Sequence, residues 1–314
     1  MPAPSWLKSI AQSVNRVASA SSWSARVHLA MSRWLASGAS PFRRQQVLNS
    51  LTTVTWPDHA LVPQRVRLGA DTHVWLQPHN GEFDFAAVLG GAFNYEPEVF
   101  SFLDSRMRDY DAVVEIGANV GVFTLYFTAQ LAKWGSDRRV YAFEPSRRAG
   151  LRLLKNLDLN QATNVSCFNC AVGDRTRFEW FFEPEGHLTN GSLVRDFAAK
   201  FSAEVRKAPC LMVDAAQLGE LLDTHQRVLL KIDVEGFEAP LLRALAPVIQ
   251  AKRPDILLEV LPEFEAAIND SAAMAAPGYE YFAIVSKGLQ LQDRIRAVAG
   301  RDCFLTPGGA KRRT

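Results

Sequence analysis

The sequence contains no run of eighteen apolar residues, so it predicts no helix that crosses a membrane. It also has no large charge imbalance, because 35 basic side chains are balanced by 33 acidic ones and the net charge is +2. This balance gives no reason to expect nucleic acid as a partner. The N-terminus has no continuous apolar segment of the kind that a secretory signal needs, so we expect a cytoplasmic protein.

Cysteine is scarce, with only four residues, at positions 167, 170, 210 and 303. Cys167 and Cys170 form a C-x-x-C, but no second pair and no histidine partner follows, so neither a zinc site nor a redox pair is indicated. In a strand, a spacing of three residues directs the two side chains to opposite faces. We expect reduced cysteines that act as small hydrophobic side chains, in agreement with a reducing cytosol.

The most informative segment is Glu-Ile-Gly-Ala-Asn-Val-Gly at 115–121, because one apolar run ends there and another begins. That order predicts a buried strand, a glycine turn and a helix. In the turn, Gly117 and Gly121 can take positive φ, or their lack of a side chain can let a ligand contact the backbone. The dinucleotide pattern G-x-G-x-x-G is absent, which argues against a nicotinamide-dependent oxidoreductase. Glu115, before the first glycine, suits a cationic or zwitterionic nucleoside better than pyrophosphate. The next predicted strand ends in Glu144, which is placed to accept from two ribose hydroxyls.

Three blocks in this order, 115–121, Phe-Glu-Pro at 143–145 and Lys-Ile-Asp-Val-Glu-Gly-Phe-Glu at 231–238, resemble the FkbM family of S-adenosylmethionine-dependent methyltransferases. The resemblance covers roughly residues 90–307. It implies an α/β, class I methyltransferase, Rossmann-like fold with a seven-stranded, mostly parallel sheet whose last strand is antiparallel. It also implies S-adenosyl-L-methionine as cofactor and O-methylation of a hydroxyl on a sugar, glycan or natural-product scaffold. The acceptor would be a small molecule or a glycan.

The alternation of apolar and amphipathic segments predicts parallel strands joined by helices. We expect strands at 112–116, 139–143, 165–172, 228–232 and 256–260, helices at 120–133, 146–159, 215–222 and 239–249, and a final strand pair at 281–285 and 303–306. The predicted domains are an N-terminal helical extension at 1–60, a lead-in hairpin and helix at 61–110, and a methyltransferase domain at 111–307. An insertion at 175–210 breaks the rhythm and contains an extra strand at 178–182, as lids and substrate walls often do.

The first forty residues carry large apolar side chains at helical spacing, and residues 38–44 are predicted to be a linker. These apolar residues are Trp6, Ile10, Val14 and Val17, followed by Trp23, Val27, Met31 and Trp34. The pattern indicates amphipathic helices that pack on their own domain or make a peripheral contact with a membrane or a partner. The arginine and serine content also fits a transit peptide.

The resemblance implies that Gly117, Ala118, Asn119 and Gly121 surround the methionine part of the cofactor, while Glu144 holds the ribose. Alternatively, the glycines only permit tight packing of strand against helix. Ala171 and Val172 are expected near the adenine, although Gly173-Asp174 also reads as a plain turn. Tyr95 and Glu96 match a family element that is either a lid or a buried helix start.

Asp233 ends the fourth parallel strand, so it is expected to face the transferred methyl group and to contact the cofactor. Its carboxylate would orient the acceptor hydroxyl and take its proton, and burial would make it a better base. Glu235 is a second catalytic candidate, but Glu235 and Glu238 also suit capping of the next helix. His187, in a loop with Asn190, Gly191 and Ser192, is either a base or a solvated histidine.

Glu259 closes the next strand and is expected beside Asp233. Paired carboxylates suggest a divalent metal, as in catechol methyltransferases, but the sequence offers no third ligand, so no metal site is assigned. A function of a different class also stays open, namely a non-catalytic Rossmann-like domain that serves protein interaction.

Overall fold

The computed structural model describes residues 5–82, 85–93, 95–297 and 301–308. The chain divides into two compact units, residues 1–95 and 96–314. Residues 61–110, predicted as one lead-in, are therefore shared between the units, with the hairpin in the first and the helix in the second. Within the described residues, no helix is both long enough and apolar enough to cross a membrane.

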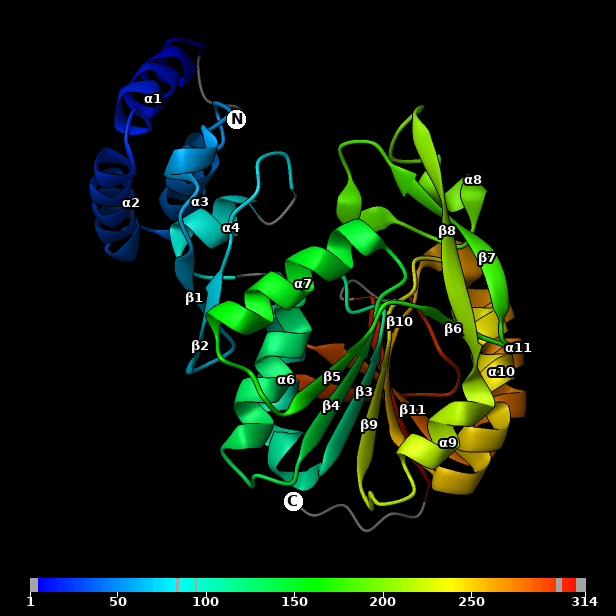
Figure 1. Ribbon diagram of the computed structural model, residues 1–314. Helices are drawn as coiled ribbons and strands as arrows, with labels where there is room; N and C mark the ends of the chain where they lie inside the picture. The colour runs from blue at the N-terminus through cyan, green and yellow to red at the C-terminus, as the bar shows by residue number, and fades with distance from the viewer. Residues whose placement is uncertain (1–4, 83–84, 94, 298–300, 309–314) are drawn as a thin grey trace. The chain divides into compact units, whose positions relative to one another are not determined.

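The first unit consists of helices and one hairpin around a small core (Figure 1). Its elements are α1 (Ser5–Ala18), α2 (Ser22–Ser37), α3 (Pro41–Leu51), η1 (Asp58–Ala60), β1 (Gln64–Leu68), β2 (Thr72–Leu76) and α4 (Phe85–Gly90). The core centres on Trp56, whose indole N–H donates to the Leu51 carbonyl at 2.7 Å. The predicted linker at 38–44 is wrong, because α3 begins at Pro41, where a helix needs no N–H donor.

The second unit is built on an eight-stranded sheet in the order β12-β11-β13-β10-β9-β3-β4-β5. Its strands are β3 (Ala112–Ile116), β4 (Arg139–Phe143), β5 (Val165–Phe168), β9 (Val228–Ile232), β10 (Asp255–Glu259), β11 (Tyr279–Val285), β12 (Gly288–Gln292) and β13 (Asp302–Pro307). The strands from β10 to β5 run parallel, and β13 is antiparallel to both of its neighbours. The predicted class I methyltransferase fold is confirmed, with one strand more than predicted, because β12 extends the sheet as a hairpin partner of β11.

Helices cover both faces of this sheet (Figure 1). One face carries α6 (Val122–Ala132) and α7 (Arg147–Leu159), and the other carries α9 (Leu218–Leu221), α10 (Glu238–Lys252) and α11 (Glu265–Ala275). Helix α5 (Pro97–Arg106) packs against α6 through the stacked rings of Phe100 and Phe123. Short 3-10 turns add η2 (Met107–Asp109), η4 (Ala215–Gln217) and η5 (Pro262–Phe264). Strands buried on both faces carry apolar side chains throughout, so Val114 packs in the same core cluster as Leu241 of α10.

A second, three-stranded sheet corrects the predicted strand at 165–172. That segment splits, because β5 ends at Phe168 and β6 (Ala171–Gly173) pairs with β8 (Val205–Asp214), which in turn pairs with β7 (Arg177–Pro184). The chain turns away at Asn169, whose side-chain amide donates to the Glu144 carbonyl at 2.7 Å. The insertion therefore contains the expected strand near 178–182 and an unexpected one, β8, with η3 (Leu188–Asn190) and α8 (Arg195–Ala198) between them.

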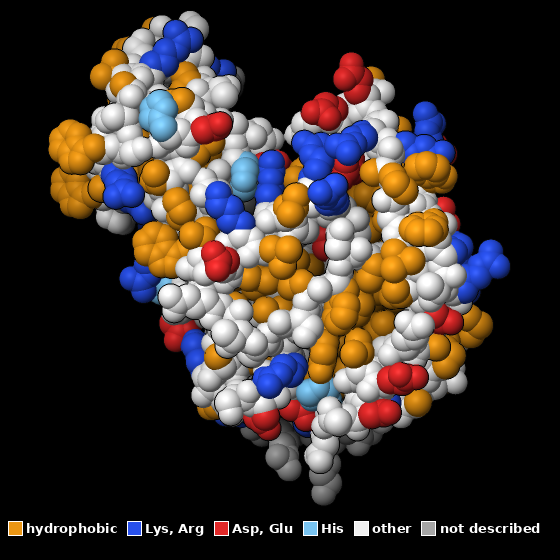
Figure 2. All heavy atoms as spheres, in the orientation of Figure 1, with side chains coloured by type: hydrophobic (Ala, Val, Ile, Leu, Met, Phe, Trp, Pro, Cys, Tyr) orange, Lys and Arg blue, Asp and Glu red, His pale blue; other side chains and the backbone are white. Residues whose placement is uncertain are grey.

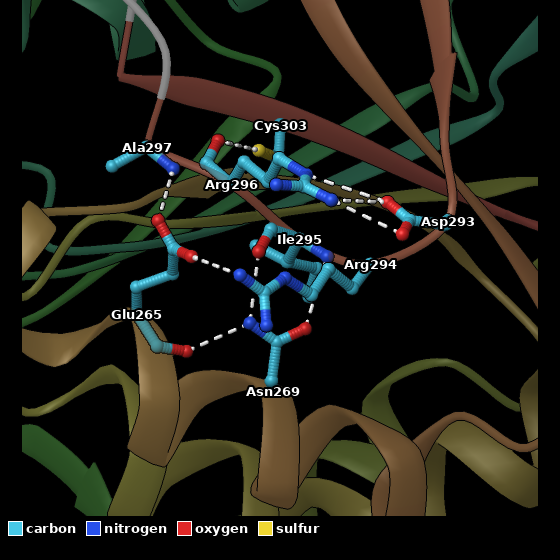
Figure 3. Close-up of polar contacts among 8 residues, drawn as sticks. All are labelled: Glu265, Asn269, Asp293, Arg294, Ile295, Arg296, Ala297 and Cys303. Carbon is cyan, nitrogen blue, oxygen red and sulfur yellow. Dashed lines mark hydrogen bonds and ion pairs between the residues drawn. The ribbon is translucent and has the colours of Figure 1, made fainter.

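The segment that leads into β13 is fastened to α11 by polar contacts (Figure 3). The Asn269 amide accepts from the Ile295 N–H at 3.0 Å and donates to the Ile295 carbonyl at 2.8 Å. Glu265 accepts from the Ala297 N–H at 3.0 Å. Ile295 itself is fully buried. These contacts fix the start of β13, which lies at the same sheet edge as the carboxyl ends of the parallel strands.

Replacing Asn269 by alanine should lower the free energy of unfolding by about 1–3 kcal/mol, because both polar groups of the Ile295 backbone lose their partner. Urea denaturation followed by circular dichroism measures this loss. Gln250→Ala is the matched control, since that amide makes one exposed bond to the Met274 carbonyl and its removal should change little. Equal stability of the Asn269 variant and the wild type would contradict the assignment.

Candidate active site

The order of the parallel strands reverses beside β3, which lies between β4 and β9. Ligands of open α/β sheets bind at the carboxyl ends of the strands near such a point. The glycine turn that follows β3 lies there, with φ of +92° at Gly117, +52° at Asn119 and +90° at Gly121. A Cβ on Gly117 would lie 1.7 Å from the carbonyl oxygen of Asp233, so only glycine lets the turn reach the end of β9. Gly117 therefore does permit tight packing, here of the glycine turn against the end of β9, and this close packing also sets the position of Asp233.

Glu144, at the end of β4, is buried and fastened to the glycine turn. One carboxylate oxygen accepts from the Asn119 N–H at 2.8 Å and the other accepts from the Ser146 N–H at 2.7 Å. Burial raises the pKa of Glu144 to about 7, although these two bonds oppose the shift. Each oxygen accepts one of these N–H groups and has a further lone pair for a ligand hydroxyl.

Lys231, at the end of β9, is a buried cation held among acids and an aromatic ring. Its ammonium group lies 2.9 Å from the Asp233 carboxylate and 4.6 Å from the centre of the Phe123 ring. Burial acts to lower the pKa of Lys231, but the charges of Asp233 and Glu115 outweigh it and raise that pKa. Lys231 therefore holds the Asp233 carboxylate in place through a partly buried ion pair.

Glu115 and Asp233 differ in their access to a ligand. Glu115 is 1% exposed and accepts from the Thr124 hydroxyl at 2.6 Å, so it lies inside the packing of β3 against α6. Burial raises the pKa of Glu115 to about 7. The Asp233 side chain is 32% exposed, so it is partly buried and still open on one side. Of the two, Asp233 is the one that a ligand can reach directly.

The two glutamates after Asp233, Glu235 and Glu238, differ in their surroundings and in their backbone conformation. Glu238 lies in the first turn of α10, and its carboxylate folds back onto the preceding loop, where it accepts from the Val234 N–H at 3.1 Å and from the Gly236 N–H at 3.1 Å. Glu235 does not cap the helix and has φ of +54°, an uncommon value for a residue other than glycine. Burial and the neighbouring carboxylates of Asp233 and Glu238 raise the pKa of Glu235. Strained backbone of this kind concentrates at functional sites.

The loop at 187–192 approaches the glycine turn and Glu235. The Asn119 amide donates to the Thr189 carbonyl at 3.0 Å, and the Ser192 hydroxyl donates to the Glu235 carbonyl at 2.7 Å. The Asn190 amide lies 3.5 Å from the Glu235 carboxylate. His187 is exposed, and its ring lies 6.2 Å from that of Phe201. The structure thus brings the loop to the site, while the role of His187 as a base stays a prediction.

A buried pair of acids flanks Asp233, and only one member was expected. Glu259 ends β10 and stands in register with Asp302 at the start of β13. One oxygen of each carboxylate is buried without a hydrogen-bond partner. Burial, followed by neighbouring acidic charges, raises the pKa of both groups. An antiparallel last strand brings its first residue to the edge where its parallel neighbours end, and this signal would have identified Asp302 from the sequence.

Four further predicted contacts, Ala171, Val172, Tyr95 and Glu96, fall in different parts of the chain. Ala171 and Val172 are buried in β6, beyond the end of β5, and their role beside the adenine stays a prediction. Tyr95 ends the first unit, half-exposed, with its ring edge against Phe93. Glu96 begins the second unit at the N-cap of α5 with φ of +49°.

Glu183 of β7 is a residue that the sequence did not single out. Its buried carboxylate accepts from the Ser146 hydroxyl, directly after Glu144 and Pro145. The charge of Glu183 contributes to the raised pKa of Glu144. The insertion therefore supplies an acid to the neighbourhood of the predicted ribose contact.

Neither cysteine chemistry nor a metal cluster emerges at the site. All four cysteines are free, and Cys170 and Cys210 pack with Phe181 and Met212 as the small hydrophobic side chains we expected. Among the residues that the structure describes, no group of three or more His, Cys, Asp or Glu side chains is arranged to hold a metal ion.

Comparison with known proteins identifies relatives of this chain. A family model described as the methyltransferase FkbM domain matches residues 115–285, which is more than half of the chain. The chain is 25% identical over 184 residues to Methyltransferase 1 of Beauveria bassiana, a match that covers 52% of this chain and 72% of that protein. It is 28% identical over 195 residues to the AMB antimetabolite synthetase AmbE of Pseudomonas aeruginosa, covering 52% of this chain and 9% of AmbE.

Among solved structures, a methyltransferase FkbM from Methylobacillus flagellatus is similar, with a TM-score of 0.39 and 18% identity. That match covers 62% of this chain and 44% of the Methylobacillus chain. This chain therefore matches less than half the length of that relative.

Proposed function

Because the chain belongs to the FkbM methyltransferase family, we propose that it transfers the methyl group of S-adenosylmethionine to a hydroxyl of a small-molecule acceptor, with a sugar, glycan or natural-product scaffold as the acceptor class. The observation that carries this proposal is the position of Asp233. Its carboxylate is held by Lys231 at the reversal point of the sheet, and it is open to a ligand. A hydroxyl is the acceptor group that such a carboxylate can both orient and deprotonate.

The residues present fit this cofactor. When bound, S-adenosylmethionine supplies an electrophilic methyl group on a positively charged sulfur. Glu144 and Asp233 offer acceptor oxygens at the ends of β4 and β9, the two strands that flank β3, and the glycine turn after β3 presents backbone rather than side chains. Glu144 suits the two ribose hydroxyls, because each of its oxygens keeps an acceptor lone pair. Acidic groups around the site favour a cationic donor.

Asp233 is the proposed acceptor of the hydroxyl proton. It would take that proton as the acceptor oxygen bonds to the methyl carbon, and the sulfur of the donor would leave with the electron pair of the broken carbon–sulfur bond. Lys231 holds the Asp233 carboxylate in place at 2.9 Å, so the carboxylate orients the hydroxyl before the proton moves. Catalysis then depends mainly on alignment and on a protein environment prepared for the developing charge.

A direct test combines binding with product analysis. Calorimetry with S-adenosylhomocysteine should show one site per chain. Incubation with methyl-labelled S-adenosylmethionine and small-molecule extracts should then move the label into one fraction, in which mass spectrometry identifies the methylated atom. Label on nitrogen or sulfur would overturn the hydroxyl assignment, and folded protein without cofactor affinity would favour the non-catalytic interaction role.

Glu144→Gln should weaken the binding of S-adenosylhomocysteine about tenfold to a hundredfold, because hydrogen bonds to a charged acceptor are stronger than those to an amide. Since burial raises the pKa of Glu144 to about 7, the carboxylate ionises as the pH rises from about 6 to 8. Affinity of the wild type should therefore increase over this range, and the increase should be smaller in the variant. Isothermal titration calorimetry at each pH measures both effects.

Glu179→Gln is the control for this prediction, since Glu179 pairs with Arg177 away from the glycine turn. It should keep both the affinity and the pH dependence of the wild type. An unchanged affinity in Glu144→Gln would remove Glu144 from the binding site.

A further inference from the structure

The two N-terminal helices expose large apolar side chains on one face each. We define the apolar stripe as Trp6, Ile10, Val14 and Val17 of α1 together with Trp23, Val27, Met31 and Trp34 of α2. All eight side chains are exposed, with Val17, Trp23 and Trp34 each at least 75% exposed. Large apolar side chains gathered on the exposed face of a helix mark an interaction site rather than ordinary surface.

The packing of the first unit uses the opposite face of each helix. At 3.6 residues per turn, Asn15 and Ser19 lie across α1 from the stripe, and both are buried. The Asn15 amide donates to the Thr53 hydroxyl at 3.0 Å, and its oxygen lies 2.7 Å from the ring nitrogen of His28. On α2, the buried residues are Ala25, Leu29, Ser32 and Ala36. The helices are thus anchored through their other sides, and this anchoring turns the stripe outward.

The chain segment that carries the stripe has charges of a single sign. Residues 1–57 contain no aspartate or glutamate, and the first acid of the chain is Asp58. The same segment has six basic residues, Lys8, Arg16, Arg26, Arg33, Arg43 and Arg44. Arg16 and Arg26 are exposed and directly precede Val17 and Val27 of the stripe, so cations border the apolar surface on both helices. Figure 2 shows hydrophobic side chains standing out from these helices, with Lys and Arg side chains among them.

We propose that the apolar stripe of α1 and α2 docks on the surface of a lipid bilayer that contains anionic headgroups. Helices of this type lie in the plane of the membrane interface, with apolar side chains in the acyl boundary and cations on the headgroups. Tryptophan favours that depth, because its ring is apolar and its indole N–H is polar, and three of the eight stripe residues are tryptophan. Anionic headgroups attract a segment with six cations and no acid.

Charge argues against a second copy of the chain as the occupant. A symmetric contact between two stripes would place two segments of six cations and no acid against each other, so the charges within the two segments would repel. A bilayer supplies the missing negative charge and accepts side chains that stand out from a surface. The stripe lies in the first unit, so this inference does not depend on the chemistry proposed for the second.

Vesicle flotation with the full chain tests the proposal. The probes are phosphatidylcholine vesicles with and without phosphatidylglycerol. Wild-type protein should float with the anionic vesicles and much less with the neutral ones. Trp23→Ser combined with Trp34→Ser should reduce binding at least about tenfold, since both large interfacial anchors are lost. Arg16→Gln combined with Arg26→Gln should reduce binding to the anionic vesicles and weaken its dependence on salt.

Matched controls come from the second unit. Phe178→Ser removes an apolar side chain that is 82% exposed, and Lys287→Gln combined with Arg195→Gln removes two exposed cations. These variants should bind anionic vesicles as the wild type does. Because all substituted side chains are exposed, far-ultraviolet circular dichroism should show every variant folded.

Three outcomes would overturn the proposal. The first is wild-type protein that floats with neither kind of vesicle. The second is binding that survives loss of both tryptophans. The third is a dimer in analytical ultracentrifugation that the tryptophan variant abolishes while vesicle binding is absent, which would assign the stripe to a second copy.

Discussion

Replacing Gly117 by alanine should abolish methyl transfer and destabilise the second unit. The added Cβ would lie 1.7 Å from the carbonyl oxygen and 2.8 Å from the carbonyl carbon of Asp233, and backbone atoms cannot rotate away. The positive φ of +92° adds strain that a side chain makes worse. Together these effects should cost about 2–5 kcal/mol of folding free energy. Any relief moves Asp233, and a displacement of about 1 Å lowers a rate about a hundredfold.

Chemical denaturation and calorimetry with S-adenosylhomocysteine measure the two effects separately. Gly288→Ala is the matched control, because Gly288 also has positive φ, +109°, but no atom lies within 4 Å of its added Cβ. It should lose only about 1–2 kcal/mol of stability and keep cofactor affinity. A Gly117→Ala protein with the stability and affinity of the wild type would show that the glycine turn does not approach β9 as described.

Asp233→Asn should lower the rate of methyl transfer about a hundredfold to ten-thousandfold, which is the usual contribution of a positioned base. The asparagine keeps the size of the side chain and can still accept a hydrogen bond from Lys231, whose charge Glu115 continues to balance. The binding of S-adenosylhomocysteine should therefore change far less than the rate. Transfer of labelled methyl to the identified acceptor, measured beside calorimetry, separates chemistry from binding.

Asp223→Asn is the control for this variant, because Asp223 pairs with Lys252 on the surface and lies outside the site. It should transfer methyl at the wild-type rate. If Asp233→Asn retains the full rate, the proton of the acceptor goes elsewhere. Glu235, whose pKa is raised by burial and by neighbouring carboxylates, would then be the next residue to substitute.

The strand, turn and helix around 115–121 could be predicted because each part has a local cause. Apolar runs predict buried strands, and a glycine pair between a strand and a helix predicts a turn. The strands at 112–116, 139–143 and 228–232 were predicted with the bounds that the structure has. Asp233 and the glycine turn were expected side by side, because both follow the carboxyl ends of neighbouring parallel strands. The structure brings their backbones into contact.

The split of the segment at 165–172 could not be predicted, because both halves have the same extended, apolar pattern. The split depends on the Asn169 amide, which turns the chain by bonding the Glu144 carbonyl from another strand. The contribution of Glu183 had no local signal either. Its partner Ser146 lies 37 residues away along the chain and meets Glu183 only through the second sheet.

The amino-acid sequence by itself determined the layered α/β fold, the order of its motifs and the acids that end its strands, because periodicity and glycine placement act over a few residues. Only the tertiary structure decided which acidic side chains are bonded within the protein and which one a ligand can contact. Glu238 accepts hydrogen bonds from the loop that precedes α10, Glu115 is buried under α6, and Asp233 stays open beside Lys231. It also decided that the apolar faces of α1 and α2 turn outward, because Asn15 and its partners hold the opposite face. These outcomes depend on contacts between segments distant in the chain, and no local pattern encodes them.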